Sequence, residues 1–136
     1  MVPLKEYVAD TVAWAGYLAD SLPKRADRAF AEAERGEARV VLPEIALGEF
    51  LYLAMRDRLE GADAEAAVRE SLFLLRAAEH FRVEGLRMDD WDRFLDVPRK
   101  ELHDRMIGAM ALGRHAPLIT SDPGMKDIEG LQVLWR

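Results

Sequence analysis

Four acidic residues stand at positions where a fold can bring them together, although they are far apart in the sequence. Asp10 follows the apolar segment YVA, and Asp122 ends the segment LITSD. Glu49 is the one charged residue of the run IALGEFLYLAM, and Asp104 precedes the largely apolar segment 106–113. Gathered carboxylates repel each other unless a cation neutralises them. Their oxygens suit Mg²⁺ or Mn²⁺, and such a site orients phosphate oxygens and activates water for hydrolysis.

Other catalytic patterns are weak or missing in the sequence. The three histidines, at positions 80, 103 and 115, show no HExxH spacing, so we expect each to be a surface or boundary residue. The three serines lie in no GxSxG elbow, and no phosphate-binding glycine pattern appears. The chain has no cysteine, which excludes disulfides, thiolate catalysis and cysteine-rich zinc sites. Clustered carboxylates are therefore the main chemical signal.

Short apolar segments predict the strands that would position these acids. We expect strands at 5–9, 39–42, 81–86, 117–122 and 131–135, because these segments are apolar, β-branched or bounded by turn residues. Asp10 and Asp122 then lie at the carboxyl ends of two strands.

Helices are predicted between these strands. The first spans about 11–20, the second runs from Pro23 to a C-cap at Gly36, and the third is a long helix with Pro43 in its first turn. A fourth helix follows the break at Gly61 and Asp63. A short helix capped by Asp89 or Asp90 ends at Leu95, and a last helix runs from after Pro98 to about His115. The helix after Asp63 is expected to bury Val68, Leu72 and Leu75.

Strands separated by helices imply parallel pairing through crossovers, so the predicted class is α/β. We expect one domain over residues 1–136, with a parallel sheet of four or five strands flanked by helices on both faces. Ligands bind such sheets at the carboxyl ends of the strands, where helices also begin. Asp104 and Glu49 are then expected near this same edge of the sheet. Glu49 lies about 9 Å from the start of its helix. Glu44 competes with Glu49 for this role because it lies closer to the strand end.

Composition and charge indicate the class of protein and its expected location in the cell. Half of the 136 residues are hydrophobic and 32% are charged, which is a globular composition. No apolar run reaches the ~20 residues of a membrane span, and no signal peptide opens the chain, so we expect a cytoplasmic protein without membrane contact. The net charge of −6 argues against a nucleic-acid partner. This argument is weak, because acids gathered in one metal site would account for most of the negative charge.

Several segments resemble the PIN domain family, in the family's order. They are VADTVAWAGYL, VVLPEIALGEFLYLA, ELHDRMIGAMALGRHAPLITSD and the closing QVLW, and they are most similar to small VapC-type toxins. The resemblance implies a metal-dependent ribonuclease whose acidic pocket binds Mg²⁺ or Mn²⁺ and whose products carry 5′-phosphate and 3′-hydroxyl ends.

The resemblance also implies roles for individual residues. The four acids, Asp10, Glu49, Asp104 and Asp122, match the catalytic and metal-binding positions. Asp127 is a possible fifth metal-binding acid; Thr11, Thr120 and Ser121 match supporting hydroxyl positions; and Arg99, Arg105 and Lys126 are candidate contacts to RNA phosphates.

As a toxin of a type II toxin-antitoxin pair, the protein would be a homodimer that cuts RNA and is blocked by a small antitoxin protein. Trp14, Tyr17 and Leu18 either form such an interface or belong to the core. The alternatives are a PIN-fold RNA-processing nuclease outside a toxin-antitoxin pair and a non-catalytic protein-interaction module. A phosphatase with Asp10 as nucleophile is disfavoured, since no second aspartate follows two residues later.

Overall fold

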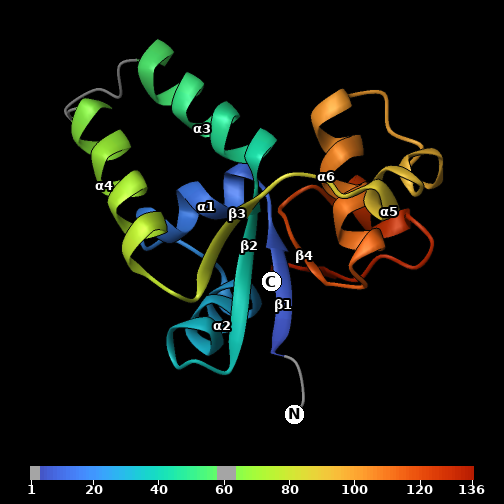
Figure 1. Cartoon of the computed structure of the whole chain (residues 1–136), viewed down its shortest axis with the longest axis horizontal. Coiled ribbons are helices and arrows are strands. Elements are labelled where there is room, and N and C mark those ends of the chain that lie inside the picture. Colours follow the sequence, from blue (N-terminus) through green and yellow to red (C-terminus); the bar gives the residue numbers. More distant parts are fainter. Residues whose placement is uncertain (1–3, 58–63) are drawn as a thin grey trace.

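The computed structural model describes residues 4–57 and 64–136. Within them lies one five-stranded parallel sheet in the order β3-β2-β1-β4-β5, which confirms the predicted α/β class (Figure 1). Its strands are β1 (Lys5–Ala9), β2 (Ala38–Pro43), β3 (Phe81–Glu84), β4 (Leu118–Ile119) and β5 (Val133–Leu134). The predicted breaks at Gly61 and Asp63 lie outside the described residues.

The central strands β1 and β2 carry the core. Tyr7, Val8 and Ala9 are buried, as is most of β2, because helices cover both faces of a parallel sheet. The register aligns Val8 with Val41 on one side and with Leu118 on the other. Asp10 therefore follows the strand at the centre of the sheet.

Helices cover the sheet on both sides. They are α1 (Thr11–Leu18), α2 (Lys24–Glu34), α3 (Glu44–Asp57), α4 (Ala64–Ala77), α5 (Met88–Trp91) and α6 (Leu102–Gly113), with short 3₁₀ helices η1 (Phe94–Asp96) and η2 (Pro123–Asp127). Figure 1 shows α5 and α6 on one side of the sheet and α1, α2 and α4 on the other. Over residues 4–57 and 64–136, no helix has the length and apolar character needed to span a membrane.

Three predicted helix starts differ from the structure. Pro43 is the last residue of β2, and α3 begins at Glu44. The helix α6 begins at Leu102 rather than near Arg99, because the side chain of Glu101 caps it by accepting a hydrogen bond from the Asp104 amide at 3.0 Å. The N-cap of α5 is Arg87, and Asp90 is the third residue of the helix, where its side chain accepts a hydrogen bond from the Arg87 amide at 2.9 Å.

The prediction that α4 buries Val68, Leu72 and Leu75 was wrong, because Val68 and Leu75 are only partly buried and Leu72 is exposed. Leu72 is 37% exposed, whereas Ser71 is fully buried and its hydroxyl accepts a hydrogen bond from the Trp14 indole at 2.7 Å. The buried indole N–H needs an acceptor, and this need places a polar residue at the contact between α4 and α1. Trp14 itself is core, and Tyr17 packs against it.

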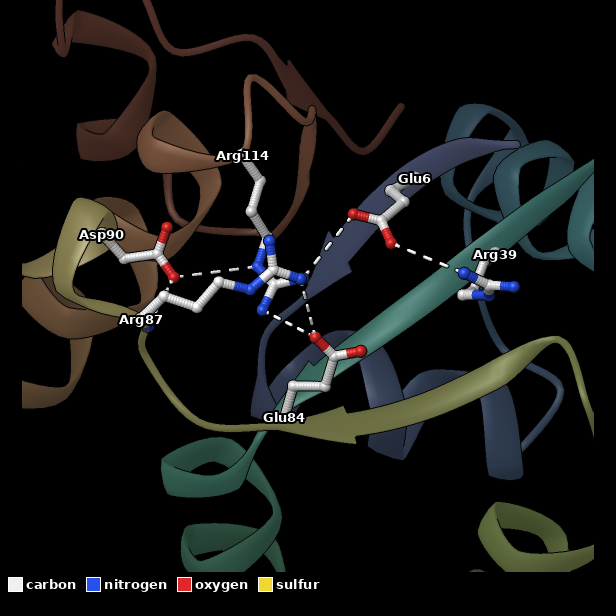
Figure 2. Close-up of polar contacts among 6 residues, drawn as sticks. All are labelled: Glu6, Arg39, Glu84, Arg87, Asp90 and Arg114. Atoms are coloured by element: carbon white, nitrogen blue, oxygen red, sulfur yellow. Dashed lines mark hydrogen bonds and ion pairs between the residues drawn. The ribbon is translucent and has the colours of Figure 1, made fainter. Parts of the chain in front are cut away.

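A buried arginine ties the end of α6 to the sheet. The Arg114 side chain is 2% exposed and forms ion pairs with Glu84 at 2.8 Å, Glu6 at 3.6 Å and Asp90 at 3.8 Å (Figure 2). These partners belong to β3, β1 and α5. Arg39 and Arg87 extend the network outward. Because this network fixes the carboxyl-terminal end of α6, it also helps to set where its amino-terminal end, with Asp104, lies over the sheet.

Candidate active site

Three aspartates are held by the ends of three different elements. Asp10 caps α1 directly after β1, with Oδ1 accepting a hydrogen bond from the Ala13 amide at 2.8 Å. Asp122 caps η2 after β4, with Oδ1 accepting from the Gly124 amide at 2.9 Å. Asp104 lies in the first turn of α6. Strand ends and helix starts meet at one edge of a parallel sheet, so these carboxylates share the edge at which ligands bind.

The charges of these aspartates act on one another. Burial raises the pKa of Asp10 from 3.8 to about 6; hydrogen bonds from Thr120 and Ala13 oppose the shift, and the charges of Asp104 and Asp122 add to it. Burial also raises the pKa of Asp104, together with the negative charges of Glu101 and Asp122. The arrangement therefore favours a cation among the three aspartates.

An arginine of this chain supplies part of that positive charge. The Nη2 atom of Arg99 donates a hydrogen bond to Oδ2 of Asp122 at 2.7 Å and lies 3.6 Å from Oδ2 of Asp104. A Cβ atom at position 124 would collide with the Arg99 guanidinium, so Gly124 leaves the room that this side chain occupies. Arg99 thus pairs with two of the three aspartates, and its single positive charge offsets only part of their negative charge.

Glu49 is held by both of its carboxylate oxygens. Oε1 accepts a hydrogen bond from the Thr11 hydroxyl at 2.7 Å, and Oε2 lies 2.6 Å from Nδ1 of His103. Thr11 is buried and adjoins Asp10 in the chain, while His103 adjoins Asp104. Glu49 is therefore connected to the aspartates through their chain neighbours. Glu44, the competing acid at the start of α3, is exposed.

His103 is the residue of this site that sequence reasoning missed. Its side chain is 36% exposed, and Nδ1 also lies 3.4 Å from Oε1 of Glu101. The only signal in the sequence was its place between Glu101 and Asp104 in the segment ELHD. Without the three-dimensional contact, nothing in that segment pointed to Glu49.

The remaining predicted site residues have varied surroundings. Thr120 is buried and its Oγ1 accepts a hydrogen bond from the Asp122 amide at 3.1 Å. Arg105 donates from Nε to the Phe94 carbonyl at 3.0 Å and covers the Phe94 ring, so it supports η1. The other three are exposed, namely Ser121, Lys126 and Asp127.

The donor set of this edge fits a hard divalent cation. Within the described part of the chain, no three histidine, aspartate or glutamate side chains are already arranged around a metal position. Arg99 holds Asp122, and Glu49 has both oxygens engaged. The groups described around Asp10 are a hydroxyl, an amide and two carboxylates, which leave its charge poorly compensated. Carboxylates of this kind are ligands for Mg²⁺ and Mn²⁺.

The chain is similar to known proteins over most of its length. The PIN domain family model matches residues 7–131. Among solved structures, VapBC2 from Rickettsia felis bound to a promoter DNA fragment has a TM-score of 0.70 at 14% identity, covering 94% of this chain and 96% of that chain. DNA-bound VapBC from Salmonella typhimurium scores 0.66 at 17% identity, covering 96% and 97%. PAE2754 from Pyrobaculum aerophilum scores 0.65 at 18% identity, covering 95% and 83%. No curated protein sequence matches.

Proposed function

Because the chain belongs to the PIN domain family, we propose that it is a metal-dependent endoribonuclease and the toxin of a type II toxin-antitoxin pair. The observation that carries the proposal is the convergence of three aspartates from separate elements, where burial raises the pKa of Asp10 and the charges of Asp104 and Asp122 add to the rise. A carboxylate cluster of this kind at the ligand-binding edge of an α/β sheet is suited to phosphodiester hydrolysis.

Asp10, Asp104 and Asp122 would hold Mg²⁺ or Mn²⁺. When bound, the cation supplies Lewis-acid chemistry, which makes water more acidic and stabilises charge on a phosphate. Hydrogen bonds from Ala13 and Thr120 orient the Asp10 carboxylate, and the Gly124 amide orients that of Asp122.

Glu49 acts from the rim of this cluster. Its contacts with Thr11 and His103 fix the carboxylate in one orientation, which suits contact to the cation through water better than direct ligation. The exposed part of Arg99 faces the same edge, and its planar guanidinium is suited to a phosphate oxygen of bound RNA once it leaves Asp122.

The toxin role has further consequences. The protein would act in the cytoplasm as a homodimer and would be inhibited by a small antitoxin. The support is that two solved neighbours are VapBC assemblies bound to DNA, one of them with a fragment of its promoter. Co-expression with the product of an adjacent small reading frame tests this role: we expect a stable complex and relief of growth inhibition. Growth inhibition that no adjacent gene relieves would contradict it and favour an RNA-processing nuclease.

RNA cleavage is tested with purified protein. Total RNA is incubated with Mn²⁺, with Mg²⁺ or with EDTA, and the new ends are mapped. We expect cleavage only with the cation, 5′-phosphate ends on the products, and loss of cleavage in Asp10→Asn. If the folded wild-type protein cleaves no RNA under any of these conditions but still binds its antitoxin, the proposal is wrong and the interaction module stands.

A further inference from the structure

Two adjoining hollows begin beside the carboxylates and extend over residues that have no role in the proposed hydrolysis. The first, of about 420 Å³, is lined by Glu49 and His103 and follows α3 away from the aspartates. The second, of about 470 Å³, lies between the start of α3, the loop after β3 and α5. Both are lined by Glu44 and Ile45, so they share a wall. We call the two hollows together the Glu44 groove.

Each hollow of the Glu44 groove has an exposed aromatic side chain in its wall. Tyr52 lines the first and is 58% exposed, and Trp91 lines the second and is 39% exposed. Apolar side chains of Leu53, Leu86 and Met106 complete the walls. Unstacked nucleobases bind on such aromatic surfaces, because every base has a π-face.

We propose that the Glu44 groove binds two unpaired bases of the RNA next to the cleaved phosphate and prefers bases that carry an amino group. The inference rests on the proposed function and adds to it a determinant of sequence preference. The first hollow reaches Glu49 and His103, so an RNA strand that leaves the aspartates along α3 enters the groove directly.

The polar groups of the groove favour RNA over an apolar peptide and select among bases. The exposed Glu44 carboxylate stands between the two hollows and can accept hydrogen bonds from an amino group, as on cytosine. Uracil instead presents a single N–H between two carbonyl oxygens, and the negative Glu44 carboxylate repels these oxygens. Arg56 lines the first hollow beyond Tyr52 and is suited to a backbone phosphate.

Binding without cleavage tests the proposal. Fluorescence anisotropy in EDTA measures the Kd of the wild-type protein for short labelled oligocytidine and oligouridine. We expect the wild type to bind oligocytidine about tenfold more tightly. Tyr52→Ala and Trp91→Ala should each weaken binding of both oligomers about tenfold. Glu44→Gln should remove the preference for oligocytidine while keeping the affinity for oligouridine. Arg56→Ala should weaken the binding of both oligomers to the same extent.

Phe73→Ala is the matched control, because Phe73 is a 67% exposed aromatic residue of α4 outside the groove. Its binding should equal that of the wild type. Equal wild-type affinity for the two oligomers, or unchanged binding in both Tyr52→Ala and Trp91→Ala, would overturn the proposal. Loss of antitoxin binding without loss of RNA binding in these variants would instead assign the groove to the protein partner. Metal-dependent cleavage of total RNA is measured separately: cleavage without base preference rejects only the groove, and base-selective binding without cleavage rejects only the nuclease.

Discussion

His103 and Glu49, from two different helices, meet at 2.6 Å between Nδ1 and Oε2. An ionised carboxylate accepts and cannot donate, so a hydrogen bond to it requires a proton on Nδ1 of His103. The other oxygen of Glu49 is held by Thr11. Glu49 is therefore oriented by protein groups on both sides, and the contact joins α3 to the first turn of α6, where Asp104 lies.

The first prediction concerns His103. His103→Ala removes one of the two contacts that orient Glu49, and loss of such a supporting contact typically lowers metal affinity or activity about 10- to 100-fold. We expect weaker Mn²⁺ binding by calorimetry and slower RNA cleavage, with little change in thermal stability. His115→Asn is the control, because His115 is an exposed histidine with a positive φ of 52° that asparagine tolerates. Equal Mn²⁺ affinity in His103→Ala and the wild type would contradict the role.

The second prediction concerns competition between Arg99 and the cation. Arg99 donates to Asp122 at 2.7 Å, so a cation that uses this carboxylate must displace the guanidinium. Arg99→Gln removes a competing charge, and we expect Mn²⁺ affinity to rise about fivefold, as for a partly exposed ion pair worth about 1 kcal/mol. Cleavage at saturating Mn²⁺ should nevertheless fall, because a phosphate contact is lost.

The control for Arg99 is Arg93, an arginine outside the cluster that pairs with Asp96. Arg93→Gln breaks the contact with Asp96 at 2.7 Å, which lies on η1 outside the cluster, and should leave Mn²⁺ affinity unchanged. If Arg99→Gln binds Mn²⁺ more weakly than the wild type, Arg99 supports the metal site and does not compete with it.

The third prediction follows from the raised pKa of Asp10. The folded protein holds this proton to about pH 6, whereas the unfolded chain releases it near pH 3.8. The native state thus binds more protons between these values, and stability contributed by protonated Asp10 is lost as pH rises through this window. The shift corresponds to up to about 3 kcal/mol. In EDTA, Asp10→Asn should therefore unfold at higher urea than the wild type at pH 7, since asparagine also caps helices well.

The pH dependence of Asp10→Asn tests whether the charge of Asp10 causes the difference in stability. The stability gain of Asp10→Asn should shrink as the pH falls toward 4, because the wild-type carboxylate then becomes neutral. Asp27→Asn, at an exposed aspartate in the first turn of α2, should show no such gain. Added Mn²⁺ should stabilise the wild type and not Asp10→Asn. A gain that is the same at pH 4 and pH 7 would refute the electrostatic explanation.

The sequence allowed the fold and the positions of its acids relative to the sheet to be predicted, because local rules decide both. Asp10 directly follows β1, and Asp122 comes three residues after β4, so both lie beyond the carboxyl ends of parallel strands. The helix pattern brings Asp104 to the same edge. The same reasoning expected a cation to be the partner of Glu49. That expectation stays a prediction, and the structure adds two protein partners, Thr11 and His103, whose contacts depend on how α1, α3 and α6 pack.

Contacts from irregular or mixed segments were not predictable in the same way. Arg99 lies in a segment between η1 and α6 without periodic pattern, so nothing local aims its side chain at Asp122. Helical periodicity favoured Leu72 as buried, but the hydrogen-bonding need of the Trp14 indole put Ser71 there. Periodic sequence patterns predict which apolar side chains are buried, but they do not predict which single polar groups form hydrogen bonds with each other.

The last prediction concerns Arg114, whose nearly fully buried side chain pairs with carboxylates of β1, β3 and α5 (Figure 2). Arg114→Met leaves Glu84 and Asp90 without their buried cation, and breaking such a pair from one side costs about 3–5 kcal/mol. We expect a correspondingly lower urea midpoint at pH 7. Acid should narrow the difference from the wild type, because burial alone would raise the pKa of Glu84, but the Arg114 and Arg87 guanidiniums outweigh it and lower this pKa in the folded wild type. Arg35→Met, which breaks an exposed pair with Glu37, should change stability by less than about 1 kcal/mol. Equal losses in the two variants would show that Arg114 contributes as a surface charge and does not anchor α6.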